Sequence, residues 1–175
     1  MTSINQYLYV AARASMEGSF LDVGCGTGTL GCILKAWGRK GETIGIDINV
    51  KDLQMAKKNY DHIILCDARS LPFKNKTFSF VAAVEVIEHF VKSDGASFIK
   101  QLEHLTSNLL IITTPNGFQC PEKHLCGYNG HELRSFGFKV RGLINRSKLN
   151  LFIPIFLSWY LLLFANDLIA IKNVK

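Results

Sequence analysis

Four acidic side chains lie at the ends of successive hydrophobic segments in the first half of the chain. These are Asp22, Asp47, Asp67 and Glu85. In open parallel sheets, ligands bind beyond the carboxyl ends of the strands, so these carboxylates would ring one cleft. A single aspartate at a strand end is commonly a turn or cap residue, but an acid after each of four segments indicates a binding site.

A glycine-rich turn, GCGTG over residues 24–28, follows the first of these segments. Glycines let a ligand approach the backbone closely, and the helix expected after the turn presents free N–H groups to it. The spacing Gly26-x-Gly28-x-x-Gly31 also matches the dinucleotide fingerprint, and Asp47 follows where a ribose-binding acid is expected. An NAD(P)-dependent oxidoreductase is therefore one alternative.

The charge around this turn favours a different ligand. The turn contains no Lys or Arg, and a ring of carboxylates repels the phosphates of a dinucleotide. S-adenosylmethionine carries an ammonium, a sulfonium, a ribose diol and an adenine, and no phosphate. Asp47 can accept hydrogen bonds from both ribose hydroxyls, and Asp67 can accept one from the adenine amino group. The residues therefore predict a cleft for S-adenosylmethionine.

A second group of reactive side chains lies in EVIEH, residues 85–89. If a strand ends at Glu85 and a helical turn follows, Glu85, Glu88 and His89 can converge, and His124 from a later loop can join them. Such groups can act as a general base. They also admit Mg²⁺, which prefers oxygen ligands, although two carboxylates with histidine are not specific for it.

The chain contains five cysteines, an odd number without paired spacing, which favours a reducing cytosol over a disulfide framework. Cys120, His124, Cys126 and His131 form a further candidate metal group. Their spacing lacks the close C-x2-C pair of common zinc sites, so we expect them to be incidental residues of a loop. The N-terminus shows no signal-peptide pattern, and we expect a cytoplasmic protein.

The elements that must position these residues alternate between strand and helix. The pattern predicts strands at 19–23, 43–47, 62–66, 78–84, 108–113, 138–143 and 167–172. It predicts helices at 3–16, 29–37, from Asn49 or Asp52 to Tyr60, 93–105 and 132–136. This alternation indicates an α/β fold with a parallel sheet. With 175 residues, 48% of them hydrophobic and 19% charged, the chain has room for one folded domain and is neither disordered nor collagen-like.

Several motifs in order resemble the class I S-adenosylmethionine-dependent methyltransferases, specifically the type 11 group. They are LDVGCGTG (21–28), IGIDIN (44–49), CDARSLPF (66–73), FSFVAAVEVIEHF (78–90) and TTPNG (113–117). The resemblance implies a Rossmann-like seven-stranded sheet of order 3-2-1-4-5-7-6, with the last strand antiparallel and helices on both faces. It implies one methyltransferase domain over 1–175, with an N-terminal helix (1–17), a cofactor-binding core (18–145), and an apolar helix and final strand (146–175).

The resemblance also implies roles for individual residues. The implied cofactor-binding residues are Asp22, Gly24, Cys25, Gly26, Gly28, Asp47, Ile48, Asp67, Ala68 and Glu85. Residues 24–26 would contact the methionyl part, residues 47–48 the ribose and the adenine, and residues 67–68 the adenine, while Glu85 would border the methyl-transfer pocket. Glu88, His89 and His124 are the candidate catalytic residues, because EVIEH looks like the metal-binding E-x-x-E-H of small-RNA and quinone-pathway methyltransferases. Ser79 departs from the family, which usually has Asp there.

The net charge of +6 is unevenly placed along the chain. Residues 1–133 carry 13 basic and 13 acidic side chains, whereas residues 134–175 carry seven basic ones and only Asp167 as an acid. An uncharged stretch, LNLFIPIFLSWYLLLFAN, follows the basic cluster at 149–166. Basic residues beside apolar ones suit attachment to a membrane surface. A buried helix or a contact between copies in a homo-oligomer are the alternatives, and RNA binding is less favoured.

These observations predict an enzyme that transfers a methyl group from S-adenosylmethionine to a small-molecule or lipid-like acceptor. Displacement at a sulfonium methyl group requires mainly alignment, with a base where the acceptor must lose a proton. A non-catalytic module that binds the cofactor is a further alternative.

Overall fold

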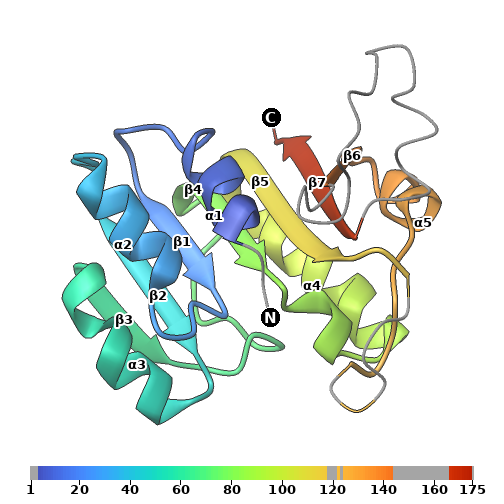
Figure 1. Ribbon diagram of the computed structural model, residues 1–175, viewed down its shortest axis with the longest axis horizontal. Coiled ribbons are helices and arrows are strands. Elements are labelled where there is room, and N and C mark those ends of the chain that lie inside the picture. The colour runs from blue at the N-terminus through green and yellow to red at the C-terminus, as the bar shows by residue number, and fades with distance from the viewer. Residues whose placement is uncertain (1–3, 118–121, 123, 144–165, 175) are drawn as a thin grey trace, which may run out of the picture.

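The computed structural model describes residues 4–117, 122, 124–143 and 166–174. Its centre is a seven-stranded sheet of order β3-β2-β1-β4-β5-β7-β6 (Figure 1). The strands are β1 (Phe20–Val23), β2 (Thr43–Asp47), β3 (His62–Leu65), β4 (Phe78–Val84), β5 (Thr106–Pro115), β6 (Lys139–Leu143) and β7 (Asp167–Asn173). Strands β1 to β5 pair in parallel, and β7 is antiparallel to both β5 and β6. The predicted fold and strand order are confirmed.

Helices cover both faces of this sheet. They are α1 (Ile4–Ala11), α2 (Thr29–Ala36), α3 (Val50–Ala56), α4 (Lys92–Leu105) and α5 (Gly130–Ser135), with the short 3₁₀ helices η1 (Lys57–Asn59) and η2 (Ile87–His89). One buried cluster joins α1, α2 and α3 to one face of the sheet, and a second joins α4 and α5 to the other. Adjacent strand residues serve opposite clusters, as alternation requires: Phe20 faces the first and Leu21 the second.

The central strands are buried almost throughout because both of their faces are covered. All four residues of β1 are buried, and six of the seven in β4 are. A parallel strand between two helical layers has no solvent face and therefore no polar alternation. This burial fixes the carboxyl ends of β1 and β4, from which the glycine-rich turn and Glu85 follow.

Some boundaries differ from the predicted ones for identifiable reasons. Helix α1 ends at Ala11, and the chain after it is held by Arg39, whose guanidinium donates hydrogen bonds to the carbonyls of Ser15 and Gly18. Strand β5 extends to Pro115, because β7 pairs with it through to Asp167. For α3, the N-cap is Asn49, whose side chain accepts a hydrogen bond from the N–H of Lys51.

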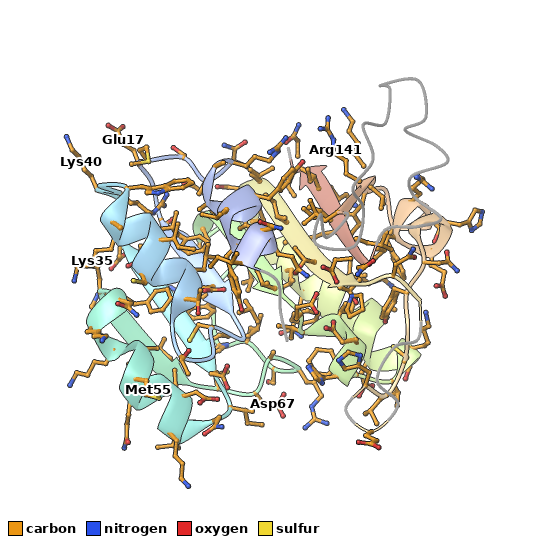
Figure 2. The ribbon with its side chains drawn as sticks, in the orientation of Figure 1. Glu17, Lys35, Lys40, Met55, Asp67 and Arg141 are labelled. Atoms are coloured by element: carbon orange, nitrogen blue, oxygen red, sulfur yellow. The ribbon has the colours of Figure 1, made fainter. Side chains whose placement is uncertain are left out.

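The described residues include no helix that is long and apolar enough to cross a membrane. Most of the uncharged segment and two of the basic residues before it fall within 144–165, outside the described residues. The expectation of a helix over that segment therefore stays a prediction. Arg134, Lys139 and Arg141 are described and exposed. Arg141, on β6, lies well away from Asp67 at the other end of the molecule (Figure 2).

Candidate functional site

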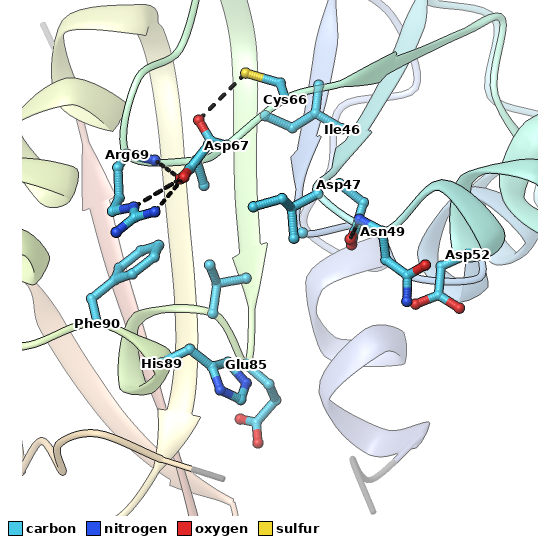
Figure 3. Close-up of a pocket in the computed structure, with 14 residues that line it drawn as sticks. Ile46, Asp47, Asn49, Asp52, Cys66, Asp67, Arg69, Glu85, His89 and Phe90 are labelled. Atoms are coloured by element: carbon cyan, nitrogen blue, oxygen red, sulfur yellow. Dashed lines mark hydrogen bonds and ion pairs between the residues drawn. The ribbon is translucent and has the colours of Figure 1, made fainter.

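A cavity of about 500 Å³ lies beyond the carboxyl ends of β1, β2, β3 and β4 (Figure 3). It is lined by Gly24, Ile46, Asp47, Ile48, Asn49, Asp52, Cys66, Asp67, Ala68, Arg69, Glu85, Val86, His89 and Phe90. Seven of these residues were predicted as site residues, and they come from four separate segments. The parallel sheet brings them together because the carboxyl ends of its strands meet at one edge.

Two glycines are required here, one in the turn after β1 and one in the first turn of α2. Gly24 has a φ of +70°, and a Cβ there would lie 2.4 Å from Cγ2 of Val86. Gly31 is needed for packing: a Cβ would lie 2.5 Å from the Tyr60 ring. Gly31, the third glycine of the apparent dinucleotide fingerprint, is therefore explained by its close contact with the Tyr60 side chain. Gly28 borders a second hollow beside α2 and α3.

Asp47 is held in place before any ligand arrives. Its Oδ2 accepts a hydrogen bond from the N–H of Gly26 at 2.8 Å, and its Oδ1 accepts one from the N–H of Asn49 at 2.9 Å. Each oxygen keeps a further lone pair for a ligand. The following side chain, Ile48, is 66% exposed although it borders the cavity. This end of the cavity therefore offers an oriented carboxylate beside an uncovered apolar surface.

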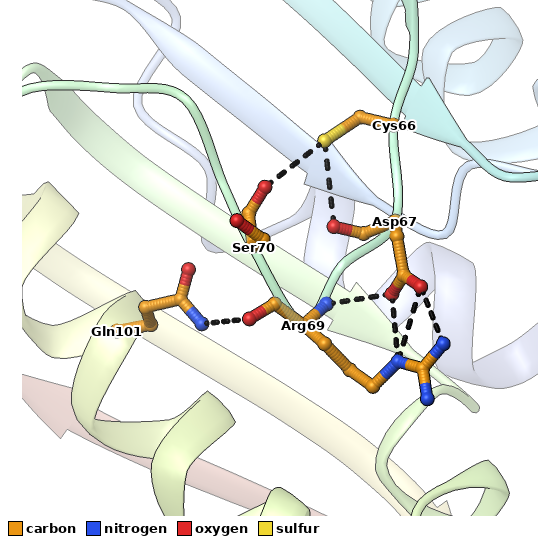
Figure 4. A network of polar contacts seen from close by, with 5 residues as sticks. All are labelled: Cys66, Asp67, Arg69, Ser70 and Gln101. Carbon is orange, nitrogen blue, oxygen red and sulfur yellow. Dashed lines mark hydrogen bonds and ion pairs between the residues drawn. The ribbon is translucent and has the colours of Figure 1, made fainter.

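Asp67 is engaged by Arg69, a residue that the sequence analysis did not select. The carboxylate accepts from the Arg69 backbone N–H at 2.9 Å, from Nε at 3.0 and 3.1 Å and from Nη2 at 2.6 Å (Figure 4). These hydrogen bonds lower the pKa of Asp67. Gln101 of α4 fixes the same loop, because its Nε2 donates to the Arg69 carbonyl at 2.9 Å. The short Asp-x-Arg spacing is a signal that could have found this pair.

Asp22 supports the turn from within the core instead of lining the cavity. It is 2% exposed, and its carboxylate accepts a hydrogen bond from the hydroxyl of Tyr60. That hydroxyl in turn accepts from the N–H of Gly31 at 3.0 Å. Burial raises the pKa of Asp22 to about 7, although the hydrogen bond from Tyr60 opposes the rise. Cys25, directly after Gly24, is also buried and does not line the cavity.

Glu85 occupies a strained position at the end of β4. Its φ is +57°, a left-handed conformation that side chains rarely adopt, and such strain concentrates at functional sites. Figure 3 shows Glu85 and His89 at the end of the cavity away from Asp67. Burial raises the pKa of Glu85, and the nearby charge of Asp167 adds to the rise. Among the described residues, Oε1 of Glu85 has no hydrogen-bond partner.

Two residues distant in sequence complete the surroundings of Glu85, and neither was predicted from the sequence. Gln6 of α1 is fully buried, and its Oε1 accepts a hydrogen bond from the hydroxyl of Thr113 at 2.5 Å. Asp167 starts β7 and pairs with Pro115. Gln6 lies close enough to both Glu85 and Asp167 to lower their pKa values. A buried glutamine inside an amphipathic helix is the only sequence signal that could have indicated the first.

Glu88, His89 and His124 form a compact group next to the cavity. One ligand-type atom from each lies within 4.8 Å of the others, and the two imidazole rings meet edge to face with centroids 5.2 Å apart. Glu85 is not part of this group, and neither are Cys126 and His131 of the suggested zinc set. Cys120 falls outside the described residues. Of the four side chains predicted to converge, the structure thus brings together three, Glu88, His89 and His124.

A comparison with protein families decides the class of this site. Residues 21–108, half of the chain, match the family described as a methyltransferase domain. The chain belongs to this family. The matched range contains the glycine-rich turn, all four strand-end acids and the EVIEH segment. The predicted class I S-adenosylmethionine-dependent methyltransferase is confirmed, and the dinucleotide-like spacing belongs to a methyltransferase.

Solved structures share the fold of the methyltransferase at low sequence identity. The small RNA methyltransferase HEN1 has a TM-score of 0.78 and 18% identity, over 99% of this chain and 25% of that one. Magnesium protoporphyrin IX methyltransferase from Synechocystis PCC 6803, with bound SAM, has a TM-score of 0.66 and 18% identity, over 98% of this chain and 77% of that one. The [4+2]-cyclase SpnF has a TM-score of 0.72 and 16% identity, over 98% of this chain and 81% of that one. The search of curated proteins found no match.

Proposed function

We propose that the methyltransferase transfers the sulfonium methyl group of S-adenosylmethionine to an acceptor that enters the cavity beside Glu85 and His89. In this reaction the S–CH₃ bond breaks as the bond to the acceptor atom forms. S-adenosylhomocysteine leaves, and any proton of the acceptor passes to a base or to water. The observation that carries the proposal is one cavity bordered by the glycine-rich turn, by Asp47 and Asp67, and by Glu85 and His89.

The arrangement of the cavity supports one orientation of the cofactor. The ribose hydroxyls would donate to Asp47, whose oxygens are already oriented, and the adenine would lie on Ile48 between Ala68 and the Asp67 loop. The methionyl part would follow the backbone of residues 24–26, and Gly28 would start the helix behind it. Asp22 would act from beneath, by holding Tyr60 and through it the helix N-terminus.

The partly buried acids at the far end, Glu85 and Asp167, suit the charge of this cofactor. Glu85 is partly buried, and this burial together with the nearby charge of Asp167 raises its pKa, so its charged form is costly in the free protein. A sulfonium or ammonium placed beside them would offset that cost, because opposite charges attract strongly where solvent screening is weak. The cationic half of S-adenosylmethionine is therefore expected at this end.

Glu88, His89 and His124 are proposed as the acceptor side of the site. His89 borders the cavity and belongs to the compact group at the same time. An imidazole there can accept the acceptor's proton during transfer. A small-molecule or lipid-like acceptor is consistent with a cavity that the described residues cover lightly, and the exposed Arg134, Lys139 and Arg141 would suit a membrane surface.

Calorimetric titration with S-adenosylhomocysteine and, separately, with NAD tests the cofactor. We expect binding of the first and none of the second, and binding of NAD alone would overturn the proposal. Incubation of the enzyme with lipid, RNA and protein fractions and a methyl-labelled donor tests the acceptor. We expect label in the lipid or small-molecule fraction, whereas label confined to RNA would contradict the proposed acceptor class.

A further inference from the structure

We propose that Arg69 is the residue of the loop after β3 that contacts the adenine of the cofactor, and that Asp67 acts on the cofactor only by positioning Arg69. This contact rests on the proposed binding of S-adenosylmethionine. It replaces the direct hydrogen bond from the adenine amino group to Asp67 that the sequence suggested. The two aspartates at this end of the cavity, Asp47 and Asp67, differ in the room that they leave for a ligand.

The acceptor positions of the Asp67 carboxylate are filled by Arg69. An ionised carboxylate offers about four lone-pair positions, two on each oxygen. Oδ1 accepts from the backbone N–H of Arg69 at 2.9 Å and from Nε at 3.1 Å, and Oδ2 accepts from Nε at 3.0 Å and from Nη2 at 2.6 Å. Asp47 accepts only one backbone N–H on each oxygen, from Gly26 and Asn49. A ribose can therefore reach Asp47 directly, whereas the adenine amino group could reach Asp67 only by displacing the guanidinium.

The loop that carries this pair is fastened to α4 and to itself. Gln101 of α4 donates from Nε2 to the Arg69 carbonyl at 2.9 Å, and its Oε1 accepts from the N–H of Leu71 at 2.7 Å. The N–H of Ser70 donates to the Asp67 carbonyl at 3.0 Å. The guanidinium is thus held at one end by a fixed main chain and at the other by the Asp67 carboxylate (Figure 4). A side chain that is already held in place loses little freedom when a ligand binds against it.

Arg69 presents a planar group to the cavity. It belongs to the cavity lining, and its side chain is 58% exposed. Figure 3 shows it on the same side of the cavity as Phe90 and across from Asn49. Nη1 takes no part in the pairing with Asp67. A guanidinium stacks its flat face on aromatic rings and donates hydrogen bonds from its edge. An adenine resting on the exposed Ile48 would therefore be covered by Arg69.

The charge of Arg69 selects the part of the cofactor that it meets. Among the described residues that line the cavity, it is the one Lys or Arg. It lies beside Asp67, at the end away from Glu85 (Figure 3). The sulfonium and ammonium of the cofactor would be repelled by the guanidinium and attracted by Glu85. The adenine is uncharged and offers a π face, on which a cation is favourable. Arg69 and Glu85 therefore favour the same orientation of the ligand from opposite ends.

Calorimetric titration of Arg69→Lys with S-adenosylhomocysteine tests this contact. Lysine keeps a positive charge beside Asp67 but lacks the planar fork of arginine. We expect the affinity to fall about two- to fivefold, the range for a cation on an aromatic ring at an exposed site. Arg69→Ala should lower it by a similar factor. The matched control is Lys57→Ala, which removes an exposed cation of η1 outside the cavity lining and should bind as wild type does.

The Nε–Hε signal of Arg69 in ¹⁵N NMR, assigned by its loss in Arg69→Lys, reports the contact directly. On saturation with S-adenosylhomocysteine the signal should persist, because Asp67 keeps its partner, and should shift, because an aromatic ring lies against it. Loss of the signal through exchange with solvent, or an unchanged position, would overturn the proposal.

Equal or tighter binding by Arg69→Lys would also overturn it, since tighter binding means that the adenine displaces Arg69 from Asp67. Either result, obtained while the wild-type protein binds S-adenosylhomocysteine, removes the role of Arg69 alone. Failure of the wild-type protein to bind S-adenosylhomocysteine would overturn the proposed function and this contact with it.

Discussion

The cavity satisfies the carboxylates at its two ends in different ways. At the β2 end, both oxygens of Asp47 accept backbone N–H groups, and Asp67 is paired with Arg69. At the β4 end, Glu85 and Glu88 keep buried oxygens without a hydrogen-bond partner among the described residues. Burial raises the pKa of both.

This difference divides the cavity into two halves. The half with Asp47 and Asp67 is called the prepared half, because its carboxylates are already paired, whereas the half with Glu85 and Glu88 needs a ligand to pair its oxygens. Where the polar groups are already paired, a ligand adds hydrogen bonds without first reorganising the site, and preorganisation of this kind favours affinity. Where charges are buried and unpaired, the free protein carries a cost that a bound cation would remove. The first half suits the invariable adenosine part of a cofactor, and the second suits the charged atoms that take part in the reaction.

The largest expected effect concerns Asp22, which lies beneath the prepared half. Its pKa of about 7 in the folded protein exceeds its unfolded value of 3.8. The folded state therefore holds the proton more tightly, so Asp22 lowers the free energy of unfolding progressively as pH rises from about 4 to 7. Asp22→Asn should remove this decline, a difference on the order of 4 kcal/mol at pH 8.

Urea unfolding of wild type and Asp22→Asn at pH 4, 6 and 8 measures this difference. The exposed Glu17→Gln serves as the control and should follow the wild-type profile. Parallel pH profiles for wild type and Asp22→Asn would show that Asp22 is ionised throughout. The prepared half would then contain a buried charge, and its contrast with the other half would weaken.

Asp47→Ala is expected to have the next largest effect, on cofactor affinity. The change removes the proposed ribose ligand and frees the N–H groups of Gly26 and Asn49. We expect the binding free energy of S-adenosylhomocysteine to weaken by about 1–3 kcal/mol, as for other unpaired polar groups. Calorimetry against Glu17→Ala checks this, and an unchanged affinity would refute the proposed orientation.

Glu85→Gln should separate stability from activity at the other end. Burial disfavours the charged form of Glu85, and its Oε1 has no hydrogen-bond partner among the described residues. Replacing this carboxylate by a neutral amide should therefore raise the free energy of unfolding by about 1–2 kcal/mol at pH 8. The rate of methyl transfer should fall, because the cation loses its nearest charge. Chemical unfolding and a single-turnover assay measure the two quantities. A variant that is both less stable and fully active would contradict the distinction between the two halves.

The smallest effect is expected for Arg69→Ala. The side chains of the Arg69–Asp67 pair are 58% and 34% exposed, and such pairs contribute less than about 1 kcal/mol to stability. The pKa of Asp67 should rise when its partner is removed. Thermal unfolding and NMR titration of the Asp67 carboxyl measure these changes. A loss of stability well above 1 kcal/mol would mean that the loop depends on this pair.

Local pattern was sufficient to predict much of the fold. The bounds of β2 and β4 are those expected, because buried parallel strands are mostly apolar and lack a regular polar alternation. The Asn49 cap and the glycine-rich turn are local features of the same kind. The pocket positions of Asp47, Asp67 and Glu85 followed from strand order, since each lies at or just after the carboxyl end of a strand at one edge of the sheet.

Contacts between distant segments could not be read from spacing. Gln6 and Asp167 reach Glu85 only because α1 crosses the sheet and β7 pairs with β5. Spacing also could not show that Asp22 faces the core or that Glu85 and Glu88 face different neighbours. The suggested zinc set fails for the same reason: Cys126 is packed into the core, whereas His131 is exposed on α5.

The insertion of β7 between β5 and β6 has a consequence for how the enzyme is made on the ribosome. Strand β6 is translated before β7 but has no other neighbour among the described strands of the sheet. Until Asp167–Asn173 emerges, β6 cannot join the sheet and β5 presents an open edge, to which other nascent chains could add. The same strand delivers Asp167 beside Glu85. Completion of this sheet and of its reactive end therefore coincide at the synthesis of β7.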